Sequence, residues 1–152
     1  YKPMTEDERY MKEALLEAQK AYDQEEVPVG AVLVVDGQIV ARGHNTVEGD
    51  RKASSHAEVK VIDQASERLG RWRLDDASLY VTLEPCAMCA GAIVNSRIKR
   101  LVIGAMDQKR GCCGSLINLV QDGAFNHQVQ LETRVLDQES VELLQSFFRK
   151  RR

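Results

Sequence analysis

Several features that would place this chain in other protein classes are missing from its sequence. No uninterrupted apolar stretch approaches the length that spans a membrane, and residues 1–10 are charged, unlike a secretory signal peptide. There is no internal repeat, no low-complexity segment and no linker rich in Pro, Gly or Ser. We therefore expect a single domain over residues 1–152, with no membrane partner and a cytoplasmic location.

Cysteine is also scarce, with four residues in the chain. Without a secretory signal, so few cysteines indicate metal ligation or free thiols rather than a disulfide framework. Apolar residues make up 43% and charged residues 29% of the sequence, as in an ordinary soluble globular protein.

An excess of positive charge is missing as well, since the formal net charge is −2. That balance argues mildly against a nucleic-acid partner. Local basic groups at 149–152, Arg51-Lys52 and Lys109-Arg110 could still meet a polyanion. Composition alone favours the simpler interpretation that the basic tail is solvated.

Local patterns predict the order of helices and strands. Thr5 and Glu8 form a capping box that opens a helix extending to about residues 21–23. Asp36-Gly37 between two apolar runs is typical of a type I′ hairpin. We expect strands at 29–35, 38–43, 78–83, 100–105 and, more weakly, 128–132; helices at 55–69, from Pro85 to about 96 and at 136–149; and a loop at 44–54.

Alternation of strands and helices in the middle of the chain implies crossovers, which place helices on both faces of one sheet. The opening hairpin makes at least one strand pair antiparallel. The predicted fold is α/β, a three-layer α/β/α sandwich with a mixed sheet of about five strands.

The chemistry is concentrated in two short motifs, His56-Ala57-Glu58 and Pro85-Cys86-Ala87-Met88-Cys89. His56, Cys86 and Cys89 supply one imidazole and two thiolates, which are ligands that Zn²⁺ prefers. Three protein ligands leave a tetrahedral zinc one open position for water, as in catalytic sites. Each ligand is expected at a helix start, and Glu58 lies two residues from His56, where it could move protons.

Simpler interpretations exist for each motif. Ser55 and Glu58 fit a capping box, which would leave His56 on the surface. Cys112-Cys113 could join Cys86 and Cys89 in a structural Cys₄ site, although adjacent cysteines seldom aim both sulfurs at one ion. His44 and His127 have no partner at ligand spacing. The combined order of both motifs favours the catalytic zinc site.

Taken together, these motifs resemble those of the cytidine deaminase-like superfamily, and within it the bacterial tRNA-specific adenosine deaminases. The similarity runs from the first expected helix to the last and includes segments at 26–32, 44–45, 72–74, 79–86, 104–111, 114–116, 125–127 and 147–149. The Cys112-Cys113 pair departs from it, because small residues with at most one cysteine are more familiar there.

The resemblance implies a cytidine deaminase-like fold, a homodimer and conversion of the wobble adenosine of a tRNA anticodon loop to inosine. Zn²⁺ with a bound water would be the cofactor and Glu58 the proton shuttle. Asn45 would hold the flipped nucleoside. The residues implied to contact loop nucleotides or phosphates are Asp107, Lys109, Phe148 and Arg149. Without the resemblance, Asn45 would be interpreted as a turn residue and Phe148 as a core aromatic.

Two other functions share part of this pattern. A deaminase of a free base or nucleotide would use the same zinc chemistry without RNA contacts. A zinc-stabilised binding module would use the cysteines without catalysis.

Overall fold

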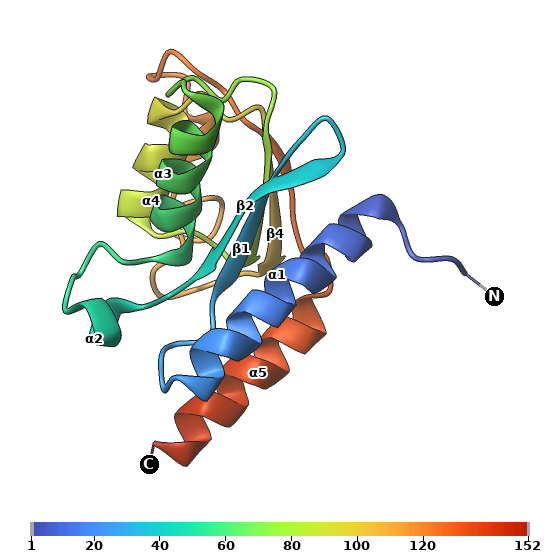
Figure 1. The fold of residues 1–152 in the computed structure, drawn as a ribbon, viewed down its shortest axis with the longest axis vertical. Coiled ribbons are helices and arrows are strands. Elements are labelled where there is room, and N and C mark those ends of the chain that lie inside the picture. The colour runs from blue at the N-terminus through green and yellow to red at the C-terminus, as the bar shows by residue number, and fades with distance from the viewer. Residues whose placement is uncertain (1, 152) are drawn as a thin grey trace.

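The computed structural model describes residues 2–151, in which a five-stranded sheet lies between two layers of helices (Figure 1). This is the predicted α/β/α sandwich. The elements in chain order are α1 (Glu6–Asp23), β1 (Gly30–Val35), β2 (Gln38–His44), α2 (Val47–Asp50), α3 (Ala57–Leu69), β3 (Ser78–Leu83), α4 (Ala87–Asn95), β4 (Arg100–Ala105), the 3₁₀ turn η1 (Leu119–Gln121), β5 (Gln130–Glu132) and α5 (Asp137–Lys150).

The sheet is mixed, with the strand order β2-β1-β3-β4-β5. β1 pairs antiparallel with both β2 and β3, whereas β3–β4 and β4–β5 are parallel. In the predicted hairpin turn, Asp36 and Gly37 have φ values of 52° and 73°. Two successive positive φ angles are what a type I′ turn requires, so this local prediction is confirmed.

Helices α3 and α4 cover one face of the sheet, and α1 and α5 cover the other (Figure 1). Alternate residues of β1 divide between the two cores: Leu33 packs toward α3 and α4, while Val32 and Val34 pack with Met11 of α1. The central strands β1, β3 and β4 are therefore buried on both faces, which explains why they are almost continuously apolar.

The structure differs from the predicted elements mainly in the loops. α2 lies within the expected loop 44–54, where the Glu26 carboxylate accepts hydrogen bonds from the backbone N–H groups of Glu48 and Gly49. η1 was not expected, and β5 is shorter than predicted. None of the described helices combines the length and the apolar character needed to cross a bilayer.

One ion pair fastens α1 to the sheet. The Arg100 guanidinium donates two hydrogen bonds to the Asp7 carboxylate, at 2.7 and 2.6 Å, and the Tyr80 hydroxyl donates a third at 2.8 Å. All three side chains are at least partly buried. The bonds from Arg100, followed by the bond from Tyr80, hold the pKa of Asp7 below its ordinary value against the effect of burial.

We expect Asp7→Asn to lower the free energy of unfolding by about 1.5–3 kcal/mol at neutral pH, because an amide N–H₂ would face the guanidinium. A carboxyl with a lowered pKa in the folded state stabilises that state above its unfolded pKa, near 3.8, and ceases to do so as the pH falls through the folded pKa. The difference between the two proteins should therefore be constant from pH 8 to 5 and shrink below pH 4. Chemical denaturation measures it, with exposed Asp63→Asn as the control; equal losses in both variants would contradict the assignment.

Candidate active site

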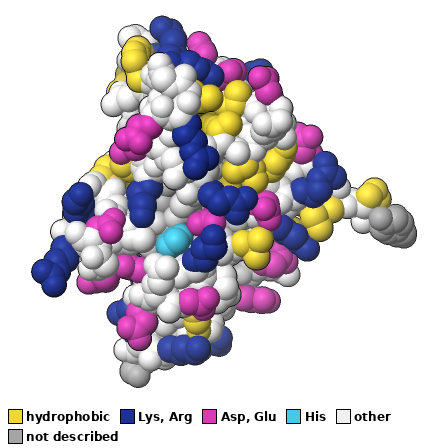
Figure 2. Space-filling model, viewed as in Figure 1, with side chains coloured by type: hydrophobic (Ala, Val, Ile, Leu, Met, Phe, Trp, Pro, Cys, Tyr) yellow, Lys and Arg dark blue, Asp and Glu magenta, His cyan; other side chains and the backbone are white. Residues whose placement is uncertain are grey.

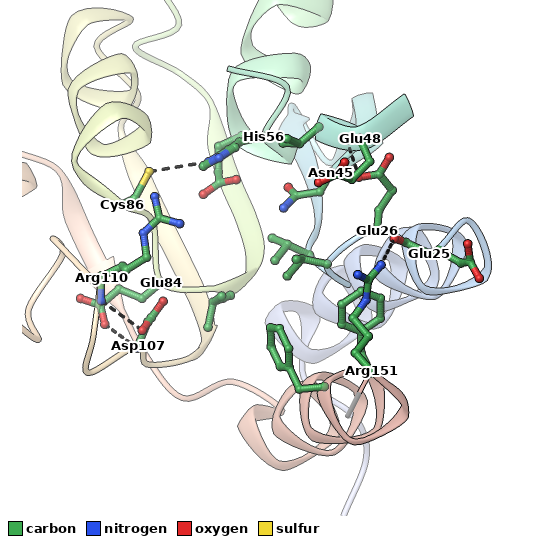
Figure 3. Close-up of a pocket in the computed structure, with 17 residues that line it drawn as sticks. Glu25, Glu26, Asn45, Glu48, His56, Glu84, Cys86, Asp107, Arg110 and Arg151 are labelled. Atoms are coloured by element: carbon green, nitrogen blue, oxygen red, sulfur yellow. Dashed lines mark hydrogen bonds between the residues drawn. The ribbon is translucent and has the colours of Figure 1, made fainter. Parts of the chain in front are cut away.

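Three predicted ligands converge at the edge of the sheet where α3 and α4 begin. His56 is the N-cap residue of α3, Cys86 is the N-cap residue of α4, and Cys89 lies in the first turn of α4. His56 Nδ1 is 3.6 Å from Cys86 Sγ and 3.4 Å from Cys89 Sγ (Figure 3). Among residues 2–151, this is the one group of three or more such side chains found with a metal-compatible arrangement.

This donor set fits Zn²⁺. Ligand atoms at about 2.0–2.3 Å from a tetrahedral zinc lie about 3.3–3.8 Å from one another, which matches both nitrogen–sulfur distances. The hydrogen bond with the Cys89 thiol and the neighbouring His56 lower the pKa of Cys86 to about 3, so Cys86 is a thiolate. The same hydrogen bond and burial raise the pKa of Cys89.

Glu58 lies in the first turn of α3, beside this cluster. Its side chain is 3% exposed, and burial raises its pKa to about 7. A carboxyl that titrates near neutral pH can both accept and donate a proton, as general acid–base catalysis requires. The capping-box interpretation is wrong, because the N-cap residue is His56 and the Ser55 hydroxyl donates instead to Asp50, at 2.8 Å.

A cavity of about 300 Å³ opens directly onto His56, Glu58 and Cys86. Asn45 also lines it, and its Oδ1 accepts a hydrogen bond of 2.8 Å from the backbone N–H of Ala57 at the start of α3. That bond fixes the amide plane and leaves the Asn45 nitrogen directed toward the cavity (Figure 3). Asn45 therefore joins the loop after β2 to the start of α3 and lines the cavity.

The residues implied to contact RNA divide into two groups. Asp107 and Phe148 line the cavity, and Phe148 is 49% exposed rather than a core aromatic. Lys109 and Arg149 are exposed and lie outside the cavity lining; Arg149 borders an adjacent hollow that it shares with Phe148. Arg152 of the basic tail lies outside the described residues.

Several cavity residues were not predicted as site residues: Glu26, Glu84, Arg110 and Arg151. Arg110 belongs to a basic pair that the sequence did single out as a possible contact with a polyanion. Glu84 directly precedes Pro85-Cys86, which was its one available signal. Arg151 reaches the cavity because it donates to the Glu25 carbonyl at 2.7 Å and lies over the Phe147 ring.

The remaining cysteines and histidines are not part of the metal cluster. Cys112 and Cys113 are buried free thiols; Cys112 Sγ lies 3.5 Å from the Arg110 carbonyl, and Cys113 lies in a β-bridge with Asn118. The structure therefore does not support the Cys₄ site. His44 contacts Glu17 and Gln24, and His127 contacts the Ile98 carbonyl.

Charge on the visible surface is mixed. Lys and Arg side chains alternate with Asp and Glu over the face in Figure 2, without one broad basic surface. A polyanion would therefore bind through individual basic side chains near the cavity, rather than through attraction to a net positive potential of the whole protein.

Comparison with known proteins gives a consistent result. The sequence model of the MafB19-like deaminase family matches residues 5–152. The chain is 54% identical, over 98% of its length and 92% of the relative, to a tRNA-specific adenosine deaminase of Bacillus subtilis (strain 168). A solved structure from a study of A-to-I editing by tRNA:A34 deaminases at the wobble position of transfer RNA has a TM-score of 0.86 and 43% identity, covering 90% of this chain and 99% of the other.

A guanine deaminase from Nitrosomonas europaea has a TM-score of 0.80 at 22% identity, covering 92% of this chain and 83% of the other. At that identity the similarity shows a shared fold alone.

We expect His56→Ala and Cys89→Ser to lower the zinc content well below one ion per chain, because each removes one of three ligands. Cys113→Ser is the matched control, since it alters a buried thiol outside the cluster and should retain zinc. Elemental analysis of the purified proteins measures the content. Full zinc content in both ligand variants would refute the assignment.

Proposed function

This chain belongs to the MafB19-like deaminases and, among them, to the tRNA-specific adenosine deaminases, and we propose that the cavity beside His56, Glu58 and Cys86 is where it reacts with its substrate. The enzyme hydrolyses adenosine to inosine at the wobble position of a tRNA anticodon loop. The observation that carries the site assignment is the buried Glu58 carboxyl next to the cluster of His56, Cys86 and Cys89.

His56 Nδ1, Cys86 Sγ and Cys89 Sγ would hold the zinc ion. When bound, zinc acts as a Lewis acid that lowers the pKa of a coordinated water toward neutrality. Backbone N–H groups at the starts of α3 and α4 favour the negative charge of the thiolates and of the reacting oxygen.

Glu58 carries out the proton transfers. It takes the proton lost by the attacking water and delivers it to N1 of the adenine, which makes C6 electrophilic while the C6–O bond forms. The proton of the new C6 hydroxyl then passes through Glu58 to the amino group, so that the C6–N bond breaks, ammonia leaves and the C6=O bond of inosine forms. Its pKa near 7 suits both roles at neutral pH.

The other cavity residues position the nucleoside. Asn45 has its oxygen engaged by Ala57, so its amide N–H₂ donates to the extruded nucleoside. Asp107 and Phe148 contact the flipped base or its neighbours from the cavity wall, while Lys109 and Arg149 meet the RNA backbone from outside. An unpaired loop base suits this cavity, because extruding it costs less than unpairing a duplex base.

We also propose that residues 1–152 form one domain and that the enzyme works in the cytoplasm. The tRNA substrate is present in the cytoplasm, and the reducing conditions of that compartment keep Cys86 and Cys89 available as metal ligands.

A homodimer is the assembly we propose. Exposed apolar side chains lie on α4, at Met88, and on the loop that follows Gly111, at Leu116 and Ile117. The backbone N–H of Cys112 donates to the Pro85 carbonyl at 2.9 Å, which joins this loop to the start of α4. We propose that a second copy covers this apolar surface.

To test the function, an anticodon stem-loop with adenosine at the wobble position is incubated with the protein beside free adenosine, guanine and cytosine. Inosine should form in the stem-loop, and Glu58→Gln should lower kcat about 10²–10⁴-fold while zinc is retained. Turnover of the free bases alone would contradict the RNA substrate. Most of the activity remaining in Glu58→Gln would remove the proton-transfer role.

To test the assembly, the molar mass of Ile117→Asp is compared with that of Leu16→Asp at micromolar concentration. Leu16 is equally exposed on α1 and serves as the matched control. We expect a dimer for the wild type and Leu16→Asp and a monomer for Ile117→Asp, because a buried aspartate would be left without a partner. A monomeric wild type, or a dimeric Ile117→Asp, would contradict the proposed interface.

A further inference from the structure

Glu84 is a buried carboxylate between the last residue of β3 and Pro85-Cys86. Its side chain is 3% exposed. Oε1 accepts a hydrogen bond of 2.9 Å from the backbone N–H of Asp107 and another from the Ser115 hydroxyl. Oε2 accepts from the backbone N–H groups of Cys113, at 3.0 Å, and Ser115, at 2.9 Å. All four donors belong to one loop, residues 107–115.

These hydrogen bonds stabilise the negative charge of the Glu84 carboxylate, as a cationic side chain would in an ion pair. Among the described residues, no Lys or Arg forms an ion pair with Glu84. Burial acts to raise the pKa of Glu84, but the bonds from Ser115, Asp107 and Cys113 outweigh it and hold the pKa below its ordinary value. A buried carboxylate satisfied in this way is costly to disturb, because every donor it loses is left unpaired.

The loop that Glu84 holds forms one wall of the cavity. Asp107 and Arg110 both line the cavity, and Asp107 Oδ1 accepts hydrogen bonds from the backbone N–H groups of Lys109 and Arg110. Figure 3 shows Glu84, Asp107 and Arg110 together below Cys86, across the cavity from Asn45.

The contact between Glu84 and this loop is close. A Cβ atom added at Gly111 would lie 2.2 Å from Glu84 Cδ and 2.5 Å from the Asp107 carbonyl oxygen. Only glycine fits between the two. The contact between Glu84 and the loop can therefore be weakened from either side, by a substitution at Glu84 or at Gly111.

We propose that Glu84 is a positioning residue for RNA recognition, whose carboxylate holds the 107–115 loop in the one arrangement in which Asp107 and Arg110 meet the anticodon loop. This proposal rests on the proposed RNA-contacting role of that loop. Holding the loop in place before binding removes the ordering cost that a mobile loop would incur when the RNA binds.

Residue 84 must be a carboxylate, because both of its side-chain oxygens accept hydrogen bonds from the loop. In Glu84→Gln, either orientation of the amide places an N–H₂ group against at least one backbone N–H donor: that of Asp107 on one side, or those of Cys113 and Ser115 on the other. At least one bond to the loop is therefore lost while the shape of the side chain is kept.

The test compares Glu84→Gln with the wild type and with Glu67→Gln, which changes an exposed glutamate of α3. On the wobble-adenosine stem-loop, Glu84→Gln should raise KM about tenfold or more while kcat stays within about threefold, since ground-state RNA binding is what is lost. Zinc content should stay at the wild-type level. Hydrogen–deuterium exchange should be faster at the amides of residues 107–115, and Glu67→Gln should match the wild type throughout.

Gly111→Ala supplies the same test from the loop side, and it replaces Glu84→Gln if that variant does not fold. An unchanged KM despite faster loop exchange would overturn the proposal. A fall in kcat at constant KM would assign Glu84 to the chemistry instead, and a loss of zinc would assign it to the metal site; both overturn the proposal. Failure of the wild type to form inosine would refute the proposed function, which is a separate outcome.

Discussion

The site depends on two helix starts meeting at one edge of the sheet. His56 and Cys86 are both N-cap residues, one of α3 and one of α4, and both helices pack on the same face. The parallel pair β3–β4 requires α4 to cross that face, and the loop after β2 returns the chain to it through α3. Ligands that are 30 residues apart in sequence are thereby brought within hydrogen-bonding range of each other.

Two buried carboxyl groups, Glu58 and Glu84, lie near the metal-compatible cluster, and their pKa values shift in opposite directions. Burial away from water disfavours the charged form of a carboxyl, and it raises the pKa of Glu58 to about 7. Glu84 has the same exposed fraction, 3%, but it lies less deeply in the protein, and hydrogen bonds from the 107–115 loop hold its pKa below the ordinary value. We therefore propose different tasks for these two carboxyl groups: Glu58 would exchange protons, and Glu84 would remain charged and hold the cavity wall.

The sequence predicted the features that arise from local patterns. The Thr5 capping box, the Asp36-Gly37 turn and the spacing of Cys86 and Cys89 each depend on residues that are close together in the chain. α2 and the anchoring of the 107–115 loop by Glu84 were missed, because each depends on a carboxylate more than twenty residues away. Glu26 and Glu84 have no periodicity that would distinguish them from surface acids, so their burial could be recognised only from the structure.

The central claim is that one nitrogen and two sulfurs hold a zinc ion whose fourth position stays open to water. X-ray absorption at the zinc edge of the purified enzyme tests this most directly. We predict two sulfur neighbours at about 2.3 Å and two lighter neighbours at about 2.0–2.1 Å, one from His56 and one from water. A first shell of four sulfurs would contradict the claim, because it would close the position at which the water must react.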